Sequence, residues 1–240
     1  MTYTNKQDTL SNVTTQETGL MASCVGLTSN VLPNDNAKGV SVRYAFDANK
    51  RWYVLRITYN RLDKAQDSID INKAEVYLPL HYVVKVINGK KKRLKEPLLP
   101  NILFVYTTKD YIESVVKDPA NDYITYYYNH FAKDNYGNNP PLTVRYSEMM
   151  NFIRLTSIDN EHIFTVEPEH CHYKSGDIVR VTQGQFTGVV GKVVRVAGQQ
   201  RVAVNVEGVC TVVTAYIPND FMIILSQNLK DWDELSSHIK

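Results

Sequence analysis

The stretch Glu96-Pro97-Leu98-Leu99-Pro100-Asn101-Ile102-Leu103-Phe104-Val105-Tyr106 decides how the centre of this chain folds. Pro97 and Pro100 each fix φ and lack an amide donor, so the chain cannot be helical here and enters the next element extended. Residues 102–106 then form an unbroken apolar run that is rich in β-forming side chains. This pattern predicts a strand buried on both faces, entered through a rigid proline elbow (residues 97–101) that leaves apolar surface at an exposed edge.

The composition is typical of a soluble protein with one large domain or two small ones. The chain has 240 residues, of which 43% are hydrophobic and 22% charged, and its formal net charge is only +2. A nucleic-acid role would therefore depend on local basic clusters. Three scattered cysteines favour a reducing compartment over a disulfide scaffold, and no run approaches the roughly 18 apolar residues of a membrane span. We expect a cytoplasmic monomer that is not bound to a membrane.

Strand and helix patterns alternate up to residue 158. Residues 1–45 are rich in Thr, Ser and Asn and predict a mobile tail. Within residues 46–158, strands are predicted at 52–59, 76–80, 82–87, 102–106 and 123–131, and amphipathic helices at 62–69, 110–118 and 148–155. Ser147 is the expected cap of the last helix, and Asn88-Gly89 predicts a tight hairpin turn. This order predicts an α+β sandwich whose helices pack on a largely antiparallel sheet.

A second style of sequence follows an expected linker at residues 159–173. Glycines recur at 176, 184, 188 and 191 among alternating valines, without a helical period. Five short strands with glycine-bearing turns predict a small SH3-like β-barrel over residues 174–226, followed by an acidic tail at 227–240. Phe186 lies between the glycines, so it would either be presented at a loop tip or fold over the mouth of the barrel.

Two basic clusters are candidates for contact with nucleic acid. The first surrounds the predicted hairpin tip and consists of Lys85, Lys90, Lys91, Lys92, Arg93 and Lys95. Such a basic finger suits phosphate contact with counterion release, but lysines also protect an exposed strand edge from aggregation. The second consists of Arg56, Arg61 and Lys64, with Tyr59 available for base stacking; isolated surface charges are the alternative.

Neither metal binding nor catalysis is predicted. His170-Cys171-His172 contains ligand-type side chains but lacks further ligands at zinc-like spacing, so a plain linker is favoured. Residues 184–188 lack the lysine and the following helix of a phosphate loop. Because no nucleophile, dinucleotide or paired-carboxylate pattern is found either, we expect no enzyme activity, no catalytic residue, no metal and no cofactor.

Two motifs resemble those of the NusG family. Gly176-Asp177-x-Val179-x-Val181-x-x-Gly184-x-Phe186-x-Gly188-x-x-Gly191-x-Val193 resembles the KOW motif. Trp52-Tyr53-Val54-Leu55, Pro79 and residues 96–105 resemble the NusG N-terminal (NGN) domain, in the family's order and spacing. General NusG proteins usually carry glycine where this chain has Asn101. In that respect the elbow is similar to the specialised paralogues RfaH and UpxY, which carry aromatics where this chain has Leu99 and Ile102.

The resemblance implies a bacterial antiterminator that binds the β′ clamp helices and the β subunit of RNA polymerase. It would promote processive elongation of a specialised operon such as one for capsular polysaccharide. The implied polymerase-binding patch is Tyr53, Leu99, Ile102 and Phe104. The implied contacts to the far side of the cleft or to non-template DNA are Arg56, Arg61, Lys64, Lys90, Lys91, Lys92 and Arg93. Through a KOW contact at Phe186, a ribosomal protein or Rho could bind. The alternative is a KOW-type RNA- or ribosome-binding protein without a polymerase role.

Overall fold

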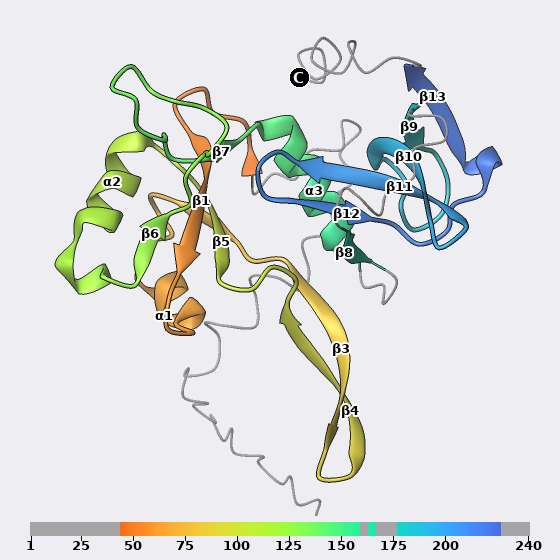
Figure 1. The fold of residues 1–240 in the computed structure, drawn as a ribbon, viewed down its shortest axis with the longest axis horizontal. Coiled ribbons are helices and arrows are strands. Elements are labelled where there is room, and N and C mark those ends of the chain that lie inside the picture. Colours follow the sequence, from red (N-terminus) through yellow and green to blue (C-terminus); the bar gives the residue numbers. More distant parts are fainter. Residues whose placement is uncertain (1–43, 159–162, 167–176, 227–240) are drawn as a thin grey trace, which may run out of the picture.

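The computed structural model describes residues 44–158, 163–166 and 177–226 (Figure 1). In these ranges the strands form a five-stranded sheet, a six-stranded sheet and a separate two-stranded hairpin. Neighbouring strands pair in the antiparallel direction, which together with the helices confirms the predicted α+β class. No helix in the described ranges is long and apolar enough to cross a membrane.

The N-terminal domain (residues 44–158) contains the first sheet, the hairpin and three helices. Its elements are β1 (Arg51–Ile57), α1 (Leu62–Asp67), β2 (Glu75–Tyr77), β3 (Leu80–Ile87), β4 (Lys90–Pro97), β5 (Ile102–Thr107), α2 (Lys109–Lys117), η2 (Pro119–Asn121), β6 (Ile124–Tyr126), β7 (Thr143–Val144) and α3 (Tyr146–Thr156). The C-terminal β-domain consists of β8 (Phe164–Val166), β9 (Ile178–Val181), β10 (Val190–Val196), β11 (Gln199–Val206), β12 (Cys210–Val213), η4 (Asn219–Phe221) and β13 (Met222–Ser226). The first sheet has the order β2-β5-β1-β6 with β7 beside β1, the second has the order β13-β9-β10-β11-β12-β8, and β3 and β4 form the hairpin.

β5 is the central strand that the proline elbow predicts. It lies between β2 and β1, and its residues alternate between two buried clusters. Phe104 and Tyr106 join one cluster, whereas Leu103 and Val105 join the other. The unbroken apolar run therefore reflects burial of both faces of the strand, as expected for a central position.

Different helices cover the two faces of the first sheet. Leu62 of α1 and Ile112 of α2 pack with Leu55 and Leu103 on one face. On the other face α3 covers the sheet, and the Phe104 and Phe152 ring centroids lie 5.5 Å apart. α3 also contacts β11, so it stands between the first sheet and the C-terminal β-domain (Figure 1).

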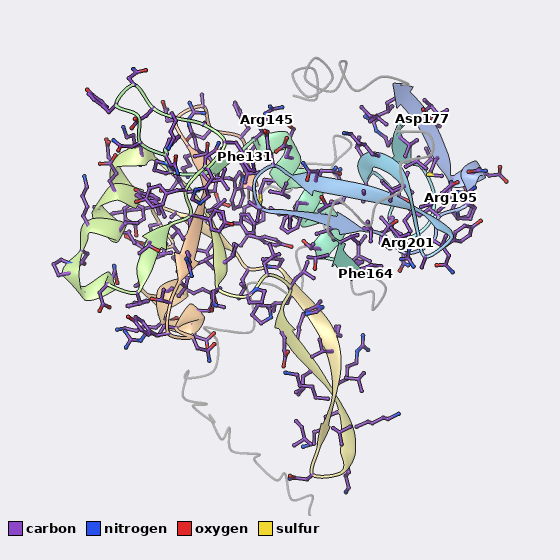
Figure 2. The ribbon with its side chains drawn as sticks, viewed as in Figure 1. Phe131, Arg145, Phe164, Asp177, Arg195 and Arg201 are labelled. Carbon is purple, nitrogen blue, oxygen red and sulfur yellow. The ribbon has the colours of Figure 1, made fainter. Side chains whose placement is uncertain are left out.

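The segment expected to be a linker contains a strand. β8 pairs with β12, with Val166 opposite Thr211 and Phe164 opposite Val213. Val166 is buried with Val213 in a small cluster, and the Arg201 guanidinium lies 5.0 Å from the centroid of the Phe164 ring (Figure 2). Burial of Val166 explains why this short segment extends the sheet that β9–β13 form. Residues 159–162 and 167–173 of the expected linker lie outside the described residues.

The structure differs from the predicted boundaries at two further helix and strand ends. Ser147 lies inside α3, whose N-cap residue is Arg145 without a side-chain capping bond. β6 ends at Tyr126, although the alternation predicts a strand to residue 131. The Tyr127 amide still donates to the Val54 carbonyl of β1, but beyond it β7 occupies the place beside β1, and Tyr128 makes an isolated bridge to Pro141. Alternation of tyrosines alone therefore does not fix where a strand ends, because another segment can take over the pairing with its neighbour.

The N-terminal domain begins before residue 46. Tyr44, expected in the tail, is fully buried with its ring 5.4 Å from that of Trp52. The Asp47 amide donates to the Tyr106 hydroxyl at 2.8 Å, which fastens the same segment to β5. Residues 1–43 of the expected tail, and the predicted tail at 227–240, lie outside the described residues.

Candidate interaction surfaces

The proline elbow ends in a tight turn. The Ile102 amide donates to the Leu99 carbonyl at 3.4 Å, and Asn101 has a φ of 61°. Proline at the second position and a residue with positive φ at the third are typical of a type II turn. Glycine and asparagine are the residues that adopt positive φ at least cost. The identity of Asn101 is therefore explained by the turn itself.

The predicted polymerase-binding patch is not a single surface. In the β1–β5 register Val54 lies opposite Phe104 and Tyr53 lies opposite Val105. Tyr53 and Phe104 consequently face opposite sides of the sheet. Phe104 is fully buried against Phe152, so it cannot belong to an exposed patch. Tyr53 is 6% exposed, and its burial raises the pKa of its hydroxyl.

The elbow itself faces the C-terminal β-domain. Leu98 and Leu99 are buried and Ile102 is half-buried. Leu98, Leu99, Pro100 and Phe131 line one side of an interdomain cavity of about 630 Å³, whose other side includes Val206, Gly208, Val209 and Cys210. Burial raises the pKa of Cys210 to about 12, so its thiol stays protonated at neutral pH. The described arrangement thus covers the edge that the sequence predicts to be open.

Polar contacts from α3 hold the two domains together. The buried Asn151 side chain accepts a hydrogen bond from the Val190 amide at 2.9 Å and donates one to the Val190 carbonyl. Arg154 Nη1 donates to the Gly188 carbonyl at 2.9 Å, and burial lowers the pKa of its guanidinium, with a smaller effect of Arg180. These contacts specify one position of the β-domain on α3, because each needs a particular backbone group.

Phe186 is not presented to a partner. It is 4% exposed and packs in the core cluster, between glycines whose φ values are 78° at Gly184 and 85° at Gly188. The glycine turns are as predicted, but they fold Phe186 inward over the β-domain. A side-chain contact of Phe186 with a binding partner is therefore excluded in this arrangement.

The basic hairpin projects away from the first sheet of its own domain and from the C-terminal β-domain (Figure 1). Its tip has positive φ at Asn88 (52°) and Gly89 (72°), as the predicted tight turn requires. Lys90 and Lys92 alternate along β4 with Lys91 and Arg93, so the four predicted cations divide between two faces of the ribbon. The structure thus supports an exposed basic element, but not a single surface containing all four side chains.

The second basic cluster forms only in part. Arg61 Cζ lies 5.3 Å from the ring centroids of both Tyr59 and Tyr123, and Lys64 Nζ lies 4.6 Å from that of Tyr123. Arg61 also pairs with Asp122 at 3.6 Å. Arg56 follows Leu55 on β1, so it points to the opposite face of the sheet from the residues that α1 covers. The structure brings Arg61 and Lys64 together and leaves Arg56 apart.

Two tyrosines complete this cluster. Tyr59 is 76% exposed and has a φ of 60°, followed by Asn60 with 54°. A bulky residue at positive φ is strained, and such strain is frequent at functional sites. Tyr123 comes from the chain just before β6, and no local pattern could have linked it to Arg61. We call Tyr59, Arg61, Lys64 and Tyr123 the Tyr–Arg cluster.

The His170-Cys171-His172 segment lies outside the described residues. Among the residues that the structure does describe, no group of three His, Cys, Asp or Glu side chains could hold a metal ion.

The fold and these surfaces define a two-part α+β protein with an exposed basic ribbon and an exposed aromatic–cationic cluster. Residues 50–153 match the protein-family model described as "Transcription termination factor nusG", so this part of the chain is similar to the proteins of that family. The matched segment includes the whole first sheet, the hairpin, the elbow and most of α3. The match supports a general role in transcription elongation or termination.

Proposed function

We propose that this protein is an antiterminator that binds RNA polymerase and promotes processive elongation. The observation that carries the proposal is the match of residues 50–153 to the NusG family model, together with the proline elbow at the end of the first sheet. The proposed contacts are the β′ clamp helices and the β subunit, and the proposed target is a specialised operon such as one for capsular polysaccharide. The proposed target is based on the resemblance of the elbow to RfaH and UpxY. Asn101 adds little support for this target, because the type II turn by itself explains an asparagine at this position.

We restrict the proposed polymerase-docking edge to the residues of the proline elbow. Leu99 and Ile102 remain candidates because they lie at the end of the sheet, whereas Phe104 and Tyr53 lie inside the domain. Since residues of the β-domain line the same cavity as Leu99, docking requires the β-domain to move away. Polymerase would then bind the open form, and its apparent affinity would fall with the fraction of molecules that are open.

The remaining surfaces suit the nucleic acid and the second partner. The exposed Tyr59 ring and the cations of the Tyr–Arg cluster are the proposed contacts to the non-template strand, because aromatic stacking next to positive charge binds single strands. The hairpin cations would reach the opposite side of the cleft. The β-domain is proposed to act as a KOW domain that binds a ribosomal protein or Rho. Its exposed Ile223 and Ile224 on β13 replace Phe186 as the candidate contacts.

The test is binding of the full chain to purified bacterial RNA polymerase, followed by size-exclusion chromatography. Asn151→Asp should loosen the β-domain and strengthen binding; adding Leu99→Asp to that variant should abolish it. If opening costs 1–3 kcal/mol less in Asn151→Asp, the affinity should rise by up to about 5- to 150-fold. Retained binding by a folded Asn151→Asp/Leu99→Asp protein would contradict the docking edge.

The competing function is a KOW-type RNA- or ribosome-binding protein without a polymerase role. Nuclease-treated lysate separates the two possibilities, because a direct polymerase contact survives digestion of nucleic acid. Recovery of ribosomes but not of polymerase, with both the wild type and Asn151→Asp, would favour the competing function.

A further inference from the structure

We infer that the hairpin β3–β4 binds duplex DNA by inserting one of its two faces into the major groove. The inference rests on the proposed function, since it gives the basic ribbon of that factor a particular ligand and a particular binding face. We call this face the cation–valine face. Its residues are Tyr82, Val84 and Val86 of β3 and Lys91, Arg93 and Lys95 of β4.

The strand register defines the cation–valine face. Residues directly opposite each other in an antiparallel pair point to the same side of the ribbon. On this side three successive opposed pairs combine an apolar or aromatic residue with a cation: Tyr82 with Lys95, Val84 with Arg93, and Val86 with Lys91. The fourth pair on this side, at the base of the ribbon, is Leu80 with Pro97. The two strands contribute no acidic residue to this side.

The other face differs in charge and in exposure. It carries Glu96, which forms an ion pair with Lys85 at 2.5 Å, so part of its positive charge is neutralised. Its apolar residues Val83, Ile87 and Leu94 are half-buried. On the cation–valine face, by contrast, Val84 is 62% and Val86 68% exposed. Burial does not account for these two valines, because most of each side chain is exposed.

A DNA groove accounts for both kinds of side chain. Lysine and arginine at the edge of a ribbon contact phosphates, and small apolar groups contact thymine methyl groups in the major groove. The Arg93 guanidinium lies 3.8 Å from the centroid of the Tyr82 ring, and Lys95 Nζ lies 5.5 Å from it. This cation–π contact holds the two cations near one side of the ribbon.

The dimensions of the hairpin fit the same ligand. The major groove of B-DNA is about 12 Å wide and admits a two-stranded β-ribbon. Eight residues in each strand make the ribbon about 27 Å long, and towards its tip the side chains stand out on both sides (Figure 2). Lys91, Arg93 and Lys95 recur every second residue, about 7 Å apart, close to the rise of two nucleotides along one strand.

The test compares two lysine pairs that lie on opposite faces of the same strand. Fluorescence anisotropy of a labelled mixed-sequence DNA duplex is measured with the full chain over a range of salt concentrations. Lys91→Ala/Lys95→Ala should weaken binding by about tenfold and reduce the slope of log K against log salt by about 2. Lys90→Ala/Lys92→Ala, which removes the same charge from the other face, should change both much less.

A second pair of variants tests the valines. Val84→Ser/Val86→Ser should weaken duplex binding without changing the salt slope, because it removes apolar contact and no charge. Equal losses for the two lysine pairs, or a wild type that does not bind the duplex, would overturn the inference. Weakened polymerase binding by Lys91→Ala/Lys95→Ala without any duplex affinity would assign the face to an acidic protein surface instead.

Polymerase binding of the same variants separates this inference from the proposed function. If Lys91→Ala/Lys95→Ala loses duplex affinity while still binding polymerase, both stand. If the wild type binds the duplex through this face but never polymerase, the proposed function fails and the DNA-binding face remains.

Discussion

Asn151 of α3 and Val190 of β10 exchange two hydrogen bonds across the junction of the two domains. The side-chain amide thus takes the place of a neighbouring strand and satisfies both backbone groups of one residue. Because Asn151 is only 7% exposed, neither group could bond to water if the pair separated without opening the interface. This single residue therefore ties the position of the β-domain to the helix that covers the central sheet.

Asn151→Asp should weaken this junction. The carboxylate can still accept from the Val190 amide, but its second oxygen would face the Val190 carbonyl, and a buried acceptor would be left unsatisfied. We expect a loss of about 1–3 kcal/mol in urea unfolding, and faster hydrogen exchange in α3 and β10. Asn219→Asp is the control, because the exposed Asn219 accepts a hydrogen bond from Gln200 through its oxygen and keeps it as Asp. Equal losses for the two variants would contradict the role of Asn151.

Gly208 marks a second close approach between the domains. A Cβ at this position would lie 3.2 Å from Leu142 Cδ1, and the φ of Gly208 is 74°. Gly198 has nearly the same φ, 77°, but a Cβ there would meet nothing within 4 Å. Gly198→Ala should therefore cost only the backbone strain, about 1–2 kcal/mol, and Gly208→Ala should cost more because Leu142 must shift. Urea unfolding of both variants isolates the packing contribution, and a smaller loss for Gly208→Ala would show that the contact is loose.

Alkaline pH should destabilise the fold partly through Tyr77. Burial raises the pKa of its hydroxyl from 10.0 to about 12, although the hydrogen bond with Thr156 lowers it somewhat. Because the folded state holds this proton more tightly, the stabilisation is complete below pH 10 and is lost as the pH rises towards 12. Tyr77→Phe should reduce the slope of the unfolding free energy against pH in this window by about 1.4 kcal/mol per pH unit. An unchanged slope would contradict the assignment.

Substitution of Tyr59 distinguishes a structural role of this residue from a role in binding nucleic acid. Its exposed ring contributes little to packing, while its φ of 60° is unfavourable for a tyrosine. In Tyr59→Gly the unfolding free energy should not fall, because relief of the strained φ offsets the added flexibility of the unfolded chain. Affinity for single-stranded DNA should nevertheless fall by about 1–3 kcal/mol, the value of one stacked base. Unchanged DNA binding would leave the Tyr–Arg cluster as a purely structural feature.

The sequence-based predictions were accurate for features that depend on neighbouring residues and inaccurate for features that depend on contacts between distant parts of the chain. The proline elbow, the central strand after it and the Asn88-Gly89 turn were predictable, because neighbouring residues limit φ and apolar runs require burial. The placement of Tyr53 and Phe104 on opposite faces of the sheet was not predictable, because a shift of one residue in the strand register moves a side chain to the other face. The contact between Arg61 and Tyr123 connects residues sixty-two positions apart in the chain, and no local sequence pattern indicates it.

The sequence by itself determined the fold class, the central strand, the hairpin with its charge and the glycine turns of the second domain, since these depend on local backbone preferences and on the total apolar surface to be buried. Only the tertiary structure decided which side chains remain exposed. Packing of α3 between the sheet and the β-domain buries Phe104, Leu99 and Phe186, and it leaves Tyr59 and the valines of the hairpin uncovered. Exposure depends on which elements meet, and these contacts join residues far apart in the chain.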